Sequence, residues 1–531
     1  MFKDNRYLNY NVAGFRKDLI AGITVGIVAI PLGMAFAIAS GVKPEYGLYS
    51  TIVAGFLVAL FGGSRFQIAG PTGAFIPILL AIVLQYGYED LLIAGLLAGV
   101  FLVIMSFAGV SNLIHFVPKS VTVGFTTGIA VIIFSGQLGN FFGLTGLEQK
   151  EFFHENMIGI VKQFHTLNLF SILTAIIGLI VIFILPKIAP RVPVLLVALL
   201  IPTLISVFLF PGKVDTIGSA FGGIPNSLPT FRFPDITLSK LVALWSPALV
   251  IAALGSIESL LSAVVADGMN DDKNAEKHDS KRELFGQGIA NIITPLFGGI
   301  PATGAIARTA TNIGSGAVSP VSGIVQSIFV LGFLLLFAPY ASYIPLAAMA
   351  PILMFVAWNM SVRKVFMHIL SIRSGDSIVL LTTFFLTIFV NLTVAVQVGM
   401  LIAVISFLRK MINKLHVKVA KVSDVENIKY SNDEPATLKK YIIDGPLFFV
   451  TAKTFEDAYP AILTGDVKSI ILDMEHTSVI DATGESVLST LIDDARKKNI
   501  TIIIKRLPKN KIALFKKSGL YEKIGKENFF M

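Results

Sequence analysis

An acidic residue, Glu258, lies in the middle of a long apolar segment, residues 241–266. A carboxylate at the centre of a membrane is costly unless it is protonated or paired, so such residues usually serve transport. Ser262 follows one helical turn later on the same face. We therefore expect Glu258, with Ser262 beside it, to take up a coupling ion, either H+ or Na+ bound by the side-chain oxygens. The alternative is a structural Glu bonded to a neighbouring helix.

A short motif is repeated at two breaks in the apolar pattern. Residues 72–74 read Thr-Gly-Ala, residues 303–305 read the same, and each copy follows a stretch rich in Gly and Pro. Paired, interrupted segments of this kind are the best sequence pointer to the binding site of a transporter. A helix that begins in mid-membrane directs free N–H groups and the positive end of its dipole inward, which favours an anion. The expected substrate contacts here are Thr72, Gly73, Ala74, Gly304 and Ala305.

Arg308 lies one turn into the second of these short segments and is the one basic residue inside either of them. We expect it to add a fixed positive charge to the anion site, or to offset the charge of Glu258. The alternative is an arginine at a helix end whose guanidinium reaches out to the membrane surface.

The elements that must position these residues are membrane helices. Only 15% of the 531 residues are charged and 54% are apolar, whereas a soluble domain carries about 25% charged residues. This composition excludes a single soluble enzyme, a disordered chain and a nucleic-acid binder. A membrane helix needs roughly 20 apolar residues, and twelve segments approach that length. They are residues 19–41, 46–62, 91–110, 120–142, 168–185, 193–210, 241–266, 284–298, 320–338, 344–358, 376–394 and 396–412.

With the two interrupted segments counted as half-helices, the sequence predicts a polytopic α-helical membrane protein of fourteen elements. The repeated motif lies seven elements apart, so the second copy should run oppositely through the membrane. Basic residues gather in alternate turns, which places both termini in the cytoplasm and accounts for the net charge of +9. The polar N-terminus has no signal-peptide pattern, so the first apolar segment is expected to stay as a span. The inner turns hold Lys3, Arg6, Arg16, Lys17, Arg65, Lys119, Lys187, Arg191, Lys281, Arg282, Arg363, Lys364, Arg373, Arg409 and Lys410.

The last part of the chain has the composition of a soluble α/β domain. We expect strands at 438–443, 447–450, 467–474 and 500–504, and helices at 483–498 and 509–518. The predicted domains are a transmembrane domain at 1–413, a linker at 414–436 and a cytoplasmic domain at 437–531. Thr483 is expected either to cap a helix or, less strongly, to be a regulatory hydroxyl. The chain has no cysteine, and its histidines lack metal-ligand spacing, so neither a metal nor a resident cofactor is expected.

Several short motifs are spread over the chain. They are residues 18–26, 30–37, 44–50, 62–65, 70–72, 118–121, 124–126, 298–301, 307–309 and, in the soluble part, 479–484. Taken together, these motifs resemble the SulP family of anion transporters with a C-terminal STAS domain, and the resemblance covers nearly the whole chain. The resemblance implies a seven-plus-seven inverted repeat with gate and core subdomains, and a homodimer. It also implies that Phe36 covers the site, that Thr72 heads the first half-helix, and that Glu258 is the acid of the eighth helix. Leu32 departs from the Gln found in several members.

The sequence thus predicts a secondary active transporter of a small inorganic anion in the cell membrane, not an enzyme. Sulfate is the default substrate that the resemblance implies, and bicarbonate or a C4-dicarboxylate is the alternative. Symport with H+ or Na+ by alternating access is expected. The rival functions are an anion channel or a sensor that signals through the STAS domain, and a nucleobase permease. The expected partners are the anion, the lipid bilayer and a second copy of the chain, with no nucleic acid.

Overall fold

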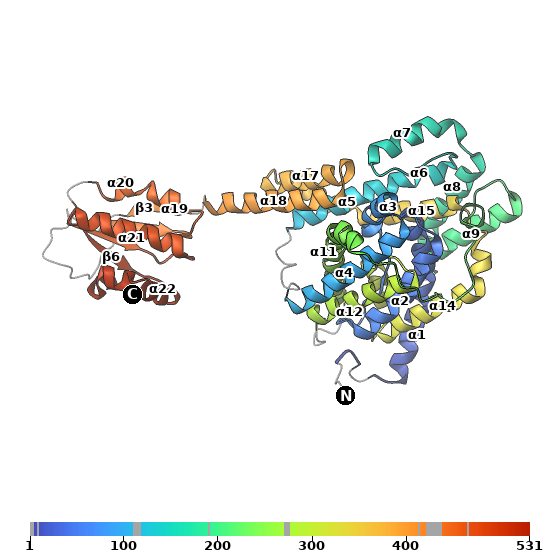
Figure 1. Cartoon of the computed structure of the whole chain (residues 1–531), viewed down its shortest axis with the longest axis horizontal. Coiled ribbons are helices and arrows are strands. Elements are labelled where there is room, and N and C mark those ends of the chain that lie inside the picture. Colours follow the sequence, from blue (N-terminus) through green and yellow to red (C-terminus); the bar gives the residue numbers. More distant parts are fainter. Residues whose placement is uncertain are drawn as a thin grey trace. The chain divides into compact units, whose positions relative to one another are not determined.

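The computed structural model describes residues 5–7, 10–109, 118–189, 192–269, 277–412, 415–420, 438–464 and 467–530. Lys3, Arg191 and most of the predicted linker lie outside the described residues. The chain forms two compact units, Met1–Met400 and Leu401–Met531, which are coloured from blue to orange and from orange to red in Figure 1.

The described residues between Val12 and Ile412 contain fourteen principal helices, which form two sets of seven. The first set is α1 (Val12–Ala39), α2 (Pro44–Phe61), α3 (Ile76–Tyr86), α4 (Tyr88–Phe107), α5 (Lys119–Gly136), α8 (Leu169–Ile188) and α9 (Val194–Leu209). The second set is α11 (Leu238–Met269), α12 (Ser280–Ile293), α13 (Ile306–Gly314), α14 (Val321–Ala341), α15 (Leu346–Met360), α17 (Gly375–Phe389) and α18 (Leu392–Ile412). Short helices connect them: α6 (Leu138–Phe142), α7 (Phe153–Gln163), α10 (Ile217–Phe221) and α16 (Arg363–Ser371).

Length and composition agree with a membrane fold. Among the described residues, nine helices are long and apolar enough to cross a membrane, and three more apolar helices are shorter. The remaining two are α13, which is the second half-helix, and α12, which is more polar than a plain span. In α12, Glu283 accepts hydrogen bonds from the backbone N–H groups of Gly63 and Ser64 at 2.9 and 3.0 Å, so its buried carboxylate is satisfied. The predicted fourteen-element fold is confirmed.

The helices form two packed groups, visible together in Figure 1. In one group, α1, α2, α4, α11, α12, α13 and α14 pack against one another; in the other, α5 packs on α15 and α17, and α8 on α9 and α15. The crossing of α4 on α12 depends on glycines: a Cβ added at Gly99 would lie 2.6 Å from the backbone N of Ile292. These two groups are the expected core and gate subdomains.

The two half-helices are joined at their starts by a two-stranded antiparallel ladder of β1 (Ala69–Gly70) and β2 (Thr303–Gly304). Ala69 pairs with Gly304 and Gly70 pairs with Thr303. The first half-helix then begins with a 3-10 turn, η2 (Gly73–Phe75), and continues as α3. Because the ladder is antiparallel, α3 and α13 leave it in opposite directions, as the repeated motif predicts.

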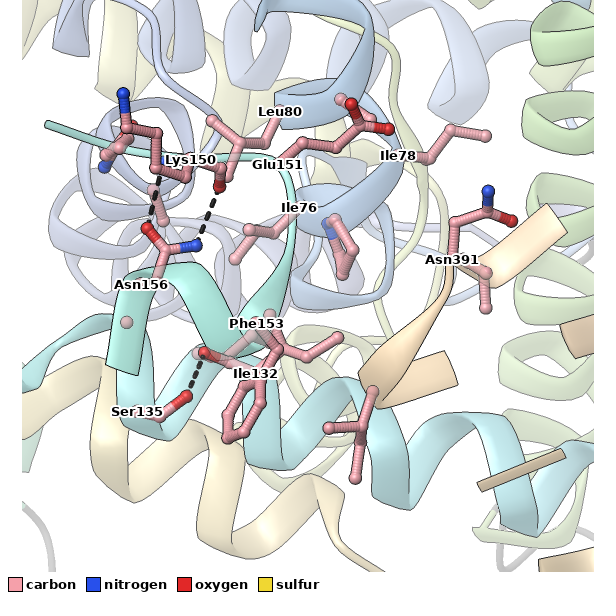
Figure 2. Close-up of a pocket in the computed structure, with 18 of the residues that line it drawn as sticks. Ile76, Ile78, Leu80, Ile132, Ser135, Lys150, Glu151, Phe153, Asn156 and Asn391 are labelled. Carbon is pink, nitrogen blue, oxygen red and sulfur yellow. Dashed lines mark hydrogen bonds between the residues drawn. The ribbon is translucent and has the colours of Figure 1, made fainter. Parts of the chain in front are cut away.

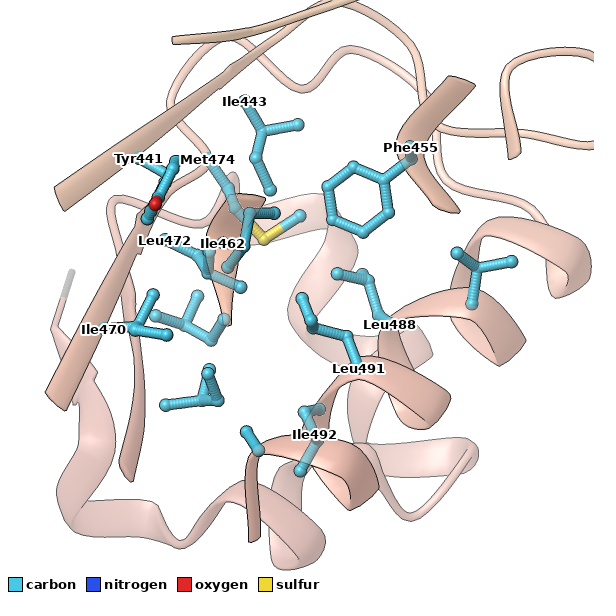
Figure 3. Packing of buried hydrophobic residues seen from close by; sticks show 14 of the residues in the cluster. Tyr441, Ile443, Phe455, Ile462, Ile470, Leu472, Met474, Leu488, Leu491 and Ile492 are labelled. Carbon is cyan, nitrogen blue, oxygen red and sulfur yellow. The ribbon is translucent and has the colours of Figure 1, made fainter. Parts of the chain in front are cut away.

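The second unit is a five-stranded sheet in the order β3-β4-β5-β6-β7, parallel except for the first pair. Its strands are β3 (His416–Ala420), β4 (Leu438–Asp444), β5 (Ser469–Asp473), β6 (Thr501–Lys505) and β7 (Phe529–Phe530). Its helices are α19 (Ala452–Glu456), α20 (Tyr459–Ile462), α21 (Ala482–Lys497), α22 (Lys509–Lys517) and α23 (Leu520–Ile524). The core lies between α21 and the sheet, where Leu488 and Leu491 face Ile470 and Leu472 (Figure 3).

Three sequence expectations for this unit need correction. Residues 416–420, inside the predicted linker, form a strand that pairs with β4, so the sheet begins before the predicted domain boundary. Residues 447–450 are not a strand, because the carbonyl of Phe448 accepts from the N–H groups of Thr451 and Ala452 and starts a turn into α19. The N-cap of α21 is Asp481, whose carboxylate accepts from the N–H of Gly484 at 2.8 Å.

Candidate functional site

A cavity of about 740 Å³ lies between the core and gate subdomains. Its core wall is built by the end of α1, the start of the first half-helix, the middle of α11 and the start of α13. Its gate wall comes from α5 and α15. The core wall includes Leu32, Phe36, Thr72, Gly73, Ala74, Glu258, Ala305 and Arg308, and the gate wall includes Lys119, Thr122, Thr126, Asn359 and Met360.

Glu258 and the first half-helix are linked directly. The hydroxyl of Thr72 donates to Glu258 Oε2 at 2.9 Å, and both side chains line the cavity. The two residues are 186 positions apart in the sequence. Glu258 was predicted from the apolar pattern of α11 and Thr72 from the Gly/Pro break, and the fold brings them together. The bond gives one carboxyl oxygen of Glu258 a hydrogen-bond donor. Because the Thr72 hydroxyl is neutral, the bond does not neutralise the charge of a deprotonated Glu258.

Arg308 is buried beside the same cavity, with a residue exposure of 2%. Its Nη2 donates to the carbonyl of Pro71 at 2.7 Å, which holds the guanidinium against the start of the other half-helix. Its Nη1 is buried with no acceptor within the described part of the protein. The guanidinium occupies space that only glycine leaves free: Gly70 has φ +156°, and a Cβ there would lie 2.5 Å from Nη1.

The backbone adds to this positive field. Gly73 and Ala74 at the start of η2, and Ile306 and Ala307 at the start of α13, lie in the first turns of their helices, where N–H groups have no intrahelical acceptor. Both helix starts reach the cavity wall. The N–H of Ala305, in contrast, donates to the carbonyl of Ile68 at 2.8 Å. Two helix N-termini and one guanidinium therefore surround a space that an anion would enter.

Phe36, which the family resemblance implies as a cover for the site, lies on the cavity wall. Its ring is nearly buried, and a Cβ added at Gly73 would lie 3.7 Å from Phe36 Cε1. The aromatic ring therefore packs over the first turn of the first half-helix, at the wall of the cavity. Its role as a cover for a bound anion stays a prediction.

Two predicted site residues do not reach the cavity. Ser262 is fully buried and donates to Thr309 Oγ1 at 3.2 Å, because this face of α11 packs on α13 while Glu258 turns toward the cavity. Gly304 lies in β2, and its N–H donates to Ser259 Oγ at 3.0 Å. Both residues therefore support the break between the half-helices from behind, and the expected Glu258–Ser262 pair is not assembled.

Sequence reasoning missed the gate wall. Thr122 and Thr126 line the cavity one turn apart on α5, and Asn359 lines it near the end of α15. Thr126 also donates to the carbonyl of Thr122 at 2.7 Å. The only sequence signal was two hydroxyl residues four positions apart in an apolar segment. Lys119, predicted as an anchor at the inner face, lies on the wall at the same end of α5.

In the second unit, Thr483 is exposed in the first turn of α21, two positions after the N-cap Asp481. Its hydroxyl is not the helix cap that the sequence suggested. Its side chain is accessible, as a regulatory hydroxyl would have to be, and that role stays a prediction. Among the described residues, no group of three His, Cys, Asp or Glu side chains is placed to hold a metal ion.

Comparisons with known proteins identify the family of the chain. Residues 15–383 match the sulfate permease family and residues 433–531 match the STAS domain. The chain is 50% identical over 525 residues to "Putative sulfate transporter YvdB" of Bacillus subtilis, covering 99% of this chain and 98% of the relative. It is 30% identical over 511 residues to "Bicarbonate transporter BicA" of Picosynechococcus sp., covering 92% of this chain and 88% of the relative.

Solved structures show the same fold. The structure of SLC26A9 superposes with a TM-score of 0.85 at 19% identity, covering 99% of this chain and 90% of that chain. The transmembrane domain of the cyanobacterial bicarbonate transporter BicA superposes with a TM-score of 0.63 at 27% identity, covering 74% of this chain and 98% of that chain.

Proposed function

The chain belongs to the sulfate permease family and carries a C-terminal STAS domain, and from that premise we propose that it is a secondary active transporter of a small inorganic anion. The observation that carries this proposal is the buried guanidinium of Arg308, which has one neutral acceptor and lies beside two helix N-termini at one cavity. Glu258 lines the same cavity, but it accepts from Thr72 and no hydrogen bond joins it to the guanidinium. Because Arg308 Nη1 is a buried charged donor without an acceptor in the described part of the protein, an anion is the ligand that would compensate it. Membership of the sulfate permease family also favours an anion over a nucleobase as the substrate.

Sulfate is the first substrate that we propose. The name of the relative that is 50% identical supports it, and the name of the relative that is 30% identical supports bicarbonate as the second candidate. A C4-dicarboxylate is the third candidate. A cavity of about 740 Å³ has room for any of these anions, so the choice among them depends on measurement and not on size.

We propose that Glu258 couples transport to a cation, and that the cation is H+. Sodium needs several oxygen ligands, and Ser262, the predicted second ligand, turns away to Thr309. Thr72, the hydroxyl partner of Glu258, heads the half-helix to which the anion would bind. Protonation of the carboxylate would remove a negative charge close to the anion, which explains why the two would move together.

The position of the cavity between two subdomains supports the proposal of alternating access. The lining residues Lys119, Leu195 and Thr311 lie at the ends of α5, α9 and α13 that the distribution of basic residues assigns to the cytoplasm. We propose that the cavity opens inward, that both termini and the STAS domain are cytoplasmic, and that the core moves against the gate to open outward. We propose that the protein lies in the cell membrane.

Uptake into proteoliposomes tests this function. Labelled sulfate, bicarbonate and fumarate are offered separately, each under an imposed pH gradient or Na+ gradient. We expect concentrative uptake of sulfate under an inward proton gradient, and loss of the gradient effect in Glu258→Gln. Currents without dependence on either gradient would favour an anion channel. No uptake of any of the three would favour a sensor that acts through the STAS domain.

The homodimer that the family resemblance implies is a further part of the proposal. Light scattering of the detergent-purified chain, corrected for bound detergent, should give the mass of two chains. A monomer mass in detergent and in nanodiscs would contradict it.

A further inference from the structure

A second cavity, of about 240 Å³, lies along the other end of the first half-helix (Figure 2). Ile76, Ile78 and Leu80 of α3 form one side, and Ile132 and Ser135 of α5 form the opposite side. The turn between α17 and α18 contributes Asn391, and residues 147–151 of the loop before α7 complete the wall. Since α3 packs on the core helix α4, the second cavity lies between the core and gate helices, as the first cavity does.

A thin layer separates the two cavities. Gly73 lines the first cavity and Ile133 lines the second. A Cβ added at Gly73 would lie 3.2 Å from Ile133 Cδ1, so the two residues are in contact across the layer. The N-terminal turn of the first half-helix faces one cavity and its later turns face the other. A ligand that passed from one to the other would follow the surface of this helix.

The loop that closes the second cavity is attached to the gate. The side chain of Asn156 in α7 donates to the carbonyl of Lys150 at 2.7 Å and accepts from its N–H at 2.9 Å. Phe153 packs edge to face on Phe389 of α17, with ring centroids 5.8 Å apart. The loop at 147–151 is therefore held to α7 and α17 on the gate side.

The same loop also reaches the core. At the end of α3, Gln85 Nε2 donates to Glu151 Oε1 at 2.8 Å. At the end of α1, a Cβ added at Gly41 would lie 3.6 Å from Gln149 Oε1. A hydrogen bond between the gate loop and the core crosses the boundary along which the two subdomains would move.

We infer that the second cavity is the closed outer half of the route of the anion, and that residues 147–151 are its lid, latched by Gln85 and Glu151. This inference rests on the proposed function, and it adds the path by which the anion reaches the site from the side opposite the basic turns. When the core moves away from the gate, the latch breaks, the layer at Gly73 and Ile133 separates, and the second cavity becomes continuous with the site.

The absence of cysteine from the chain allows the lid to be measured without any transport substrate. Ser135→Cys places one thiol in the second cavity, and a membrane-impermeant maleimide is added outside whole cells. Labelling should be slow in this variant and about threefold faster when Gln85→Ala removes the latch. Lys150→Gln is the matched control, because it removes the exposed pair with Glu148 from the same loop and leaves the latch intact. Ile78→Cys repeats the measurement from the core wall if Ser135→Cys does not fold.

A second experiment links the lid to the anion. Gln85→Cys and Glu151→Cys, combined in a chain without other thiols, are bridged by a short reducible bifunctional reagent. Bridging should stop anion uptake, and reduction should restore it, whereas each single cysteine treated alike should keep uptake. Equal labelling with and without Gln85, or full uptake through the bridged lid, would overturn the inference. If the unmodified chain itself moves no anion, the proposed function fails, while the response of the labelling rate to Gln85→Ala still decides whether the lid exists.

Discussion

Buried charges are handled in opposite ways by the two units of the chain. In the membrane unit, the guanidinium of Arg308 donates to a peptide carbonyl and Glu258 accepts from a hydroxyl. In the C-terminal unit, the fully buried carboxylate of Asp473 lies 3.2 Å from Lys440 Nζ, and it accepts from Arg506 Nε at 3.0 Å. In the first arrangement Arg308 and Glu258 line one cavity, but each is hydrogen-bonded to a neutral group; in the second, two cations bind the acid directly.

The difference shows what each arrangement serves. A buried ion pair fixes a structure but leaves no charge for a ligand, and breaking it exposes the desolvation cost of the remaining ion. A buried charge that has neutral hydrogen-bond partners and also lines a cavity, unlike the enclosed carboxylate of Glu283, keeps its attraction for an ion that arrives from solution. We therefore propose that the cluster around Asp473 stabilises the sheet and that Arg308 and Glu258 serve transport.

The largest expected effect is on the cluster of Asp473, Lys440 and Arg506, called the stable cluster below. Asp473→Ala leaves Lys440, whose side chain is 7% exposed, without its acid, and removing one partner of a buried pair costs about 3–5 kcal/mol. Hydrogen exchange of the β5 amides in the full-length chain should become much faster. Asp457→Ala is the control, because its pair with Lys453 is exposed on both sides, and it should leave β5 protection unchanged. Equal protection in both variants would contradict the assignment.

The next effect concerns the transport charge. Arg308→Gln keeps a side chain that can donate to Pro71 and removes the positive charge, so anion binding should weaken about 10- to 100-fold. The KM for uptake is the measurement, and hydrogen exchange of the membrane helices should change little. Lys119→Gln, an exposed charge on the wall of the same cavity, should alter the KM far less. A comparable rise in KM in both variants would mean that the cavity attracts anions by its overall charge, with no special role for Arg308.

The sequence alone predicted the features of the membrane unit that the bilayer itself constrains. Because the bilayer makes both charges and broken helices costly, Glu258, Arg308 and the two Gly/Pro breaks were identifiable without structure. The fourteen elements followed from the same constraint. The inverted arrangement of the half-helices followed from the odd number of elements between the two copies of the motif.

The remaining parts depend on tertiary packing. On α11, Glu258 lies on the face that lines the cavity, whereas Ser262 lies on the face that packs against α13. The two residues are one turn apart, and the spacing of apolar residues in the sequence does not predict where one face ends and the other begins. The ladder between β1 and β2 is two residues long on each side, so it has no pattern that would have shown Gly304 turning behind the site. Uncharged polar residues such as Thr126 and Asn359 are common in membrane helices, and their types alone do not indicate a cavity.

A smaller effect tests how the guanidinium is held. In Gly70→Ala, the new Cβ would meet Arg308 Nη1 at 2.5 Å, so the side chain must move away from Pro71, and anion affinity should fall by about tenfold. Gly87→Ala is the matched control, because Gly87 also has a positive φ, +88°, and a Cβ there would meet nothing within 4 Å. Since both variants strain the backbone, the difference in their KM values isolates the displacement of Arg308. Equal KM values would show that the guanidinium position is unimportant.

The smallest expected effect is the pH dependence of the stable cluster. Burial alone would raise the pKa of Asp473, but hydrogen bonds and charges from Arg506 and Lys440 outweigh it, and its pKa lies below the ordinary value. The carboxylate therefore contributes stability that is fully present above the unfolded pKa, about 3.9, and is lost as the pH falls through the lower folded pKa. Protection of the β5 amides should be constant from neutral pH to about pH 5, and should weaken below about pH 4. Asp473→Asn, which cannot ionise, should remove this acid dependence, and persistence of the dependence in that variant would assign it to another group.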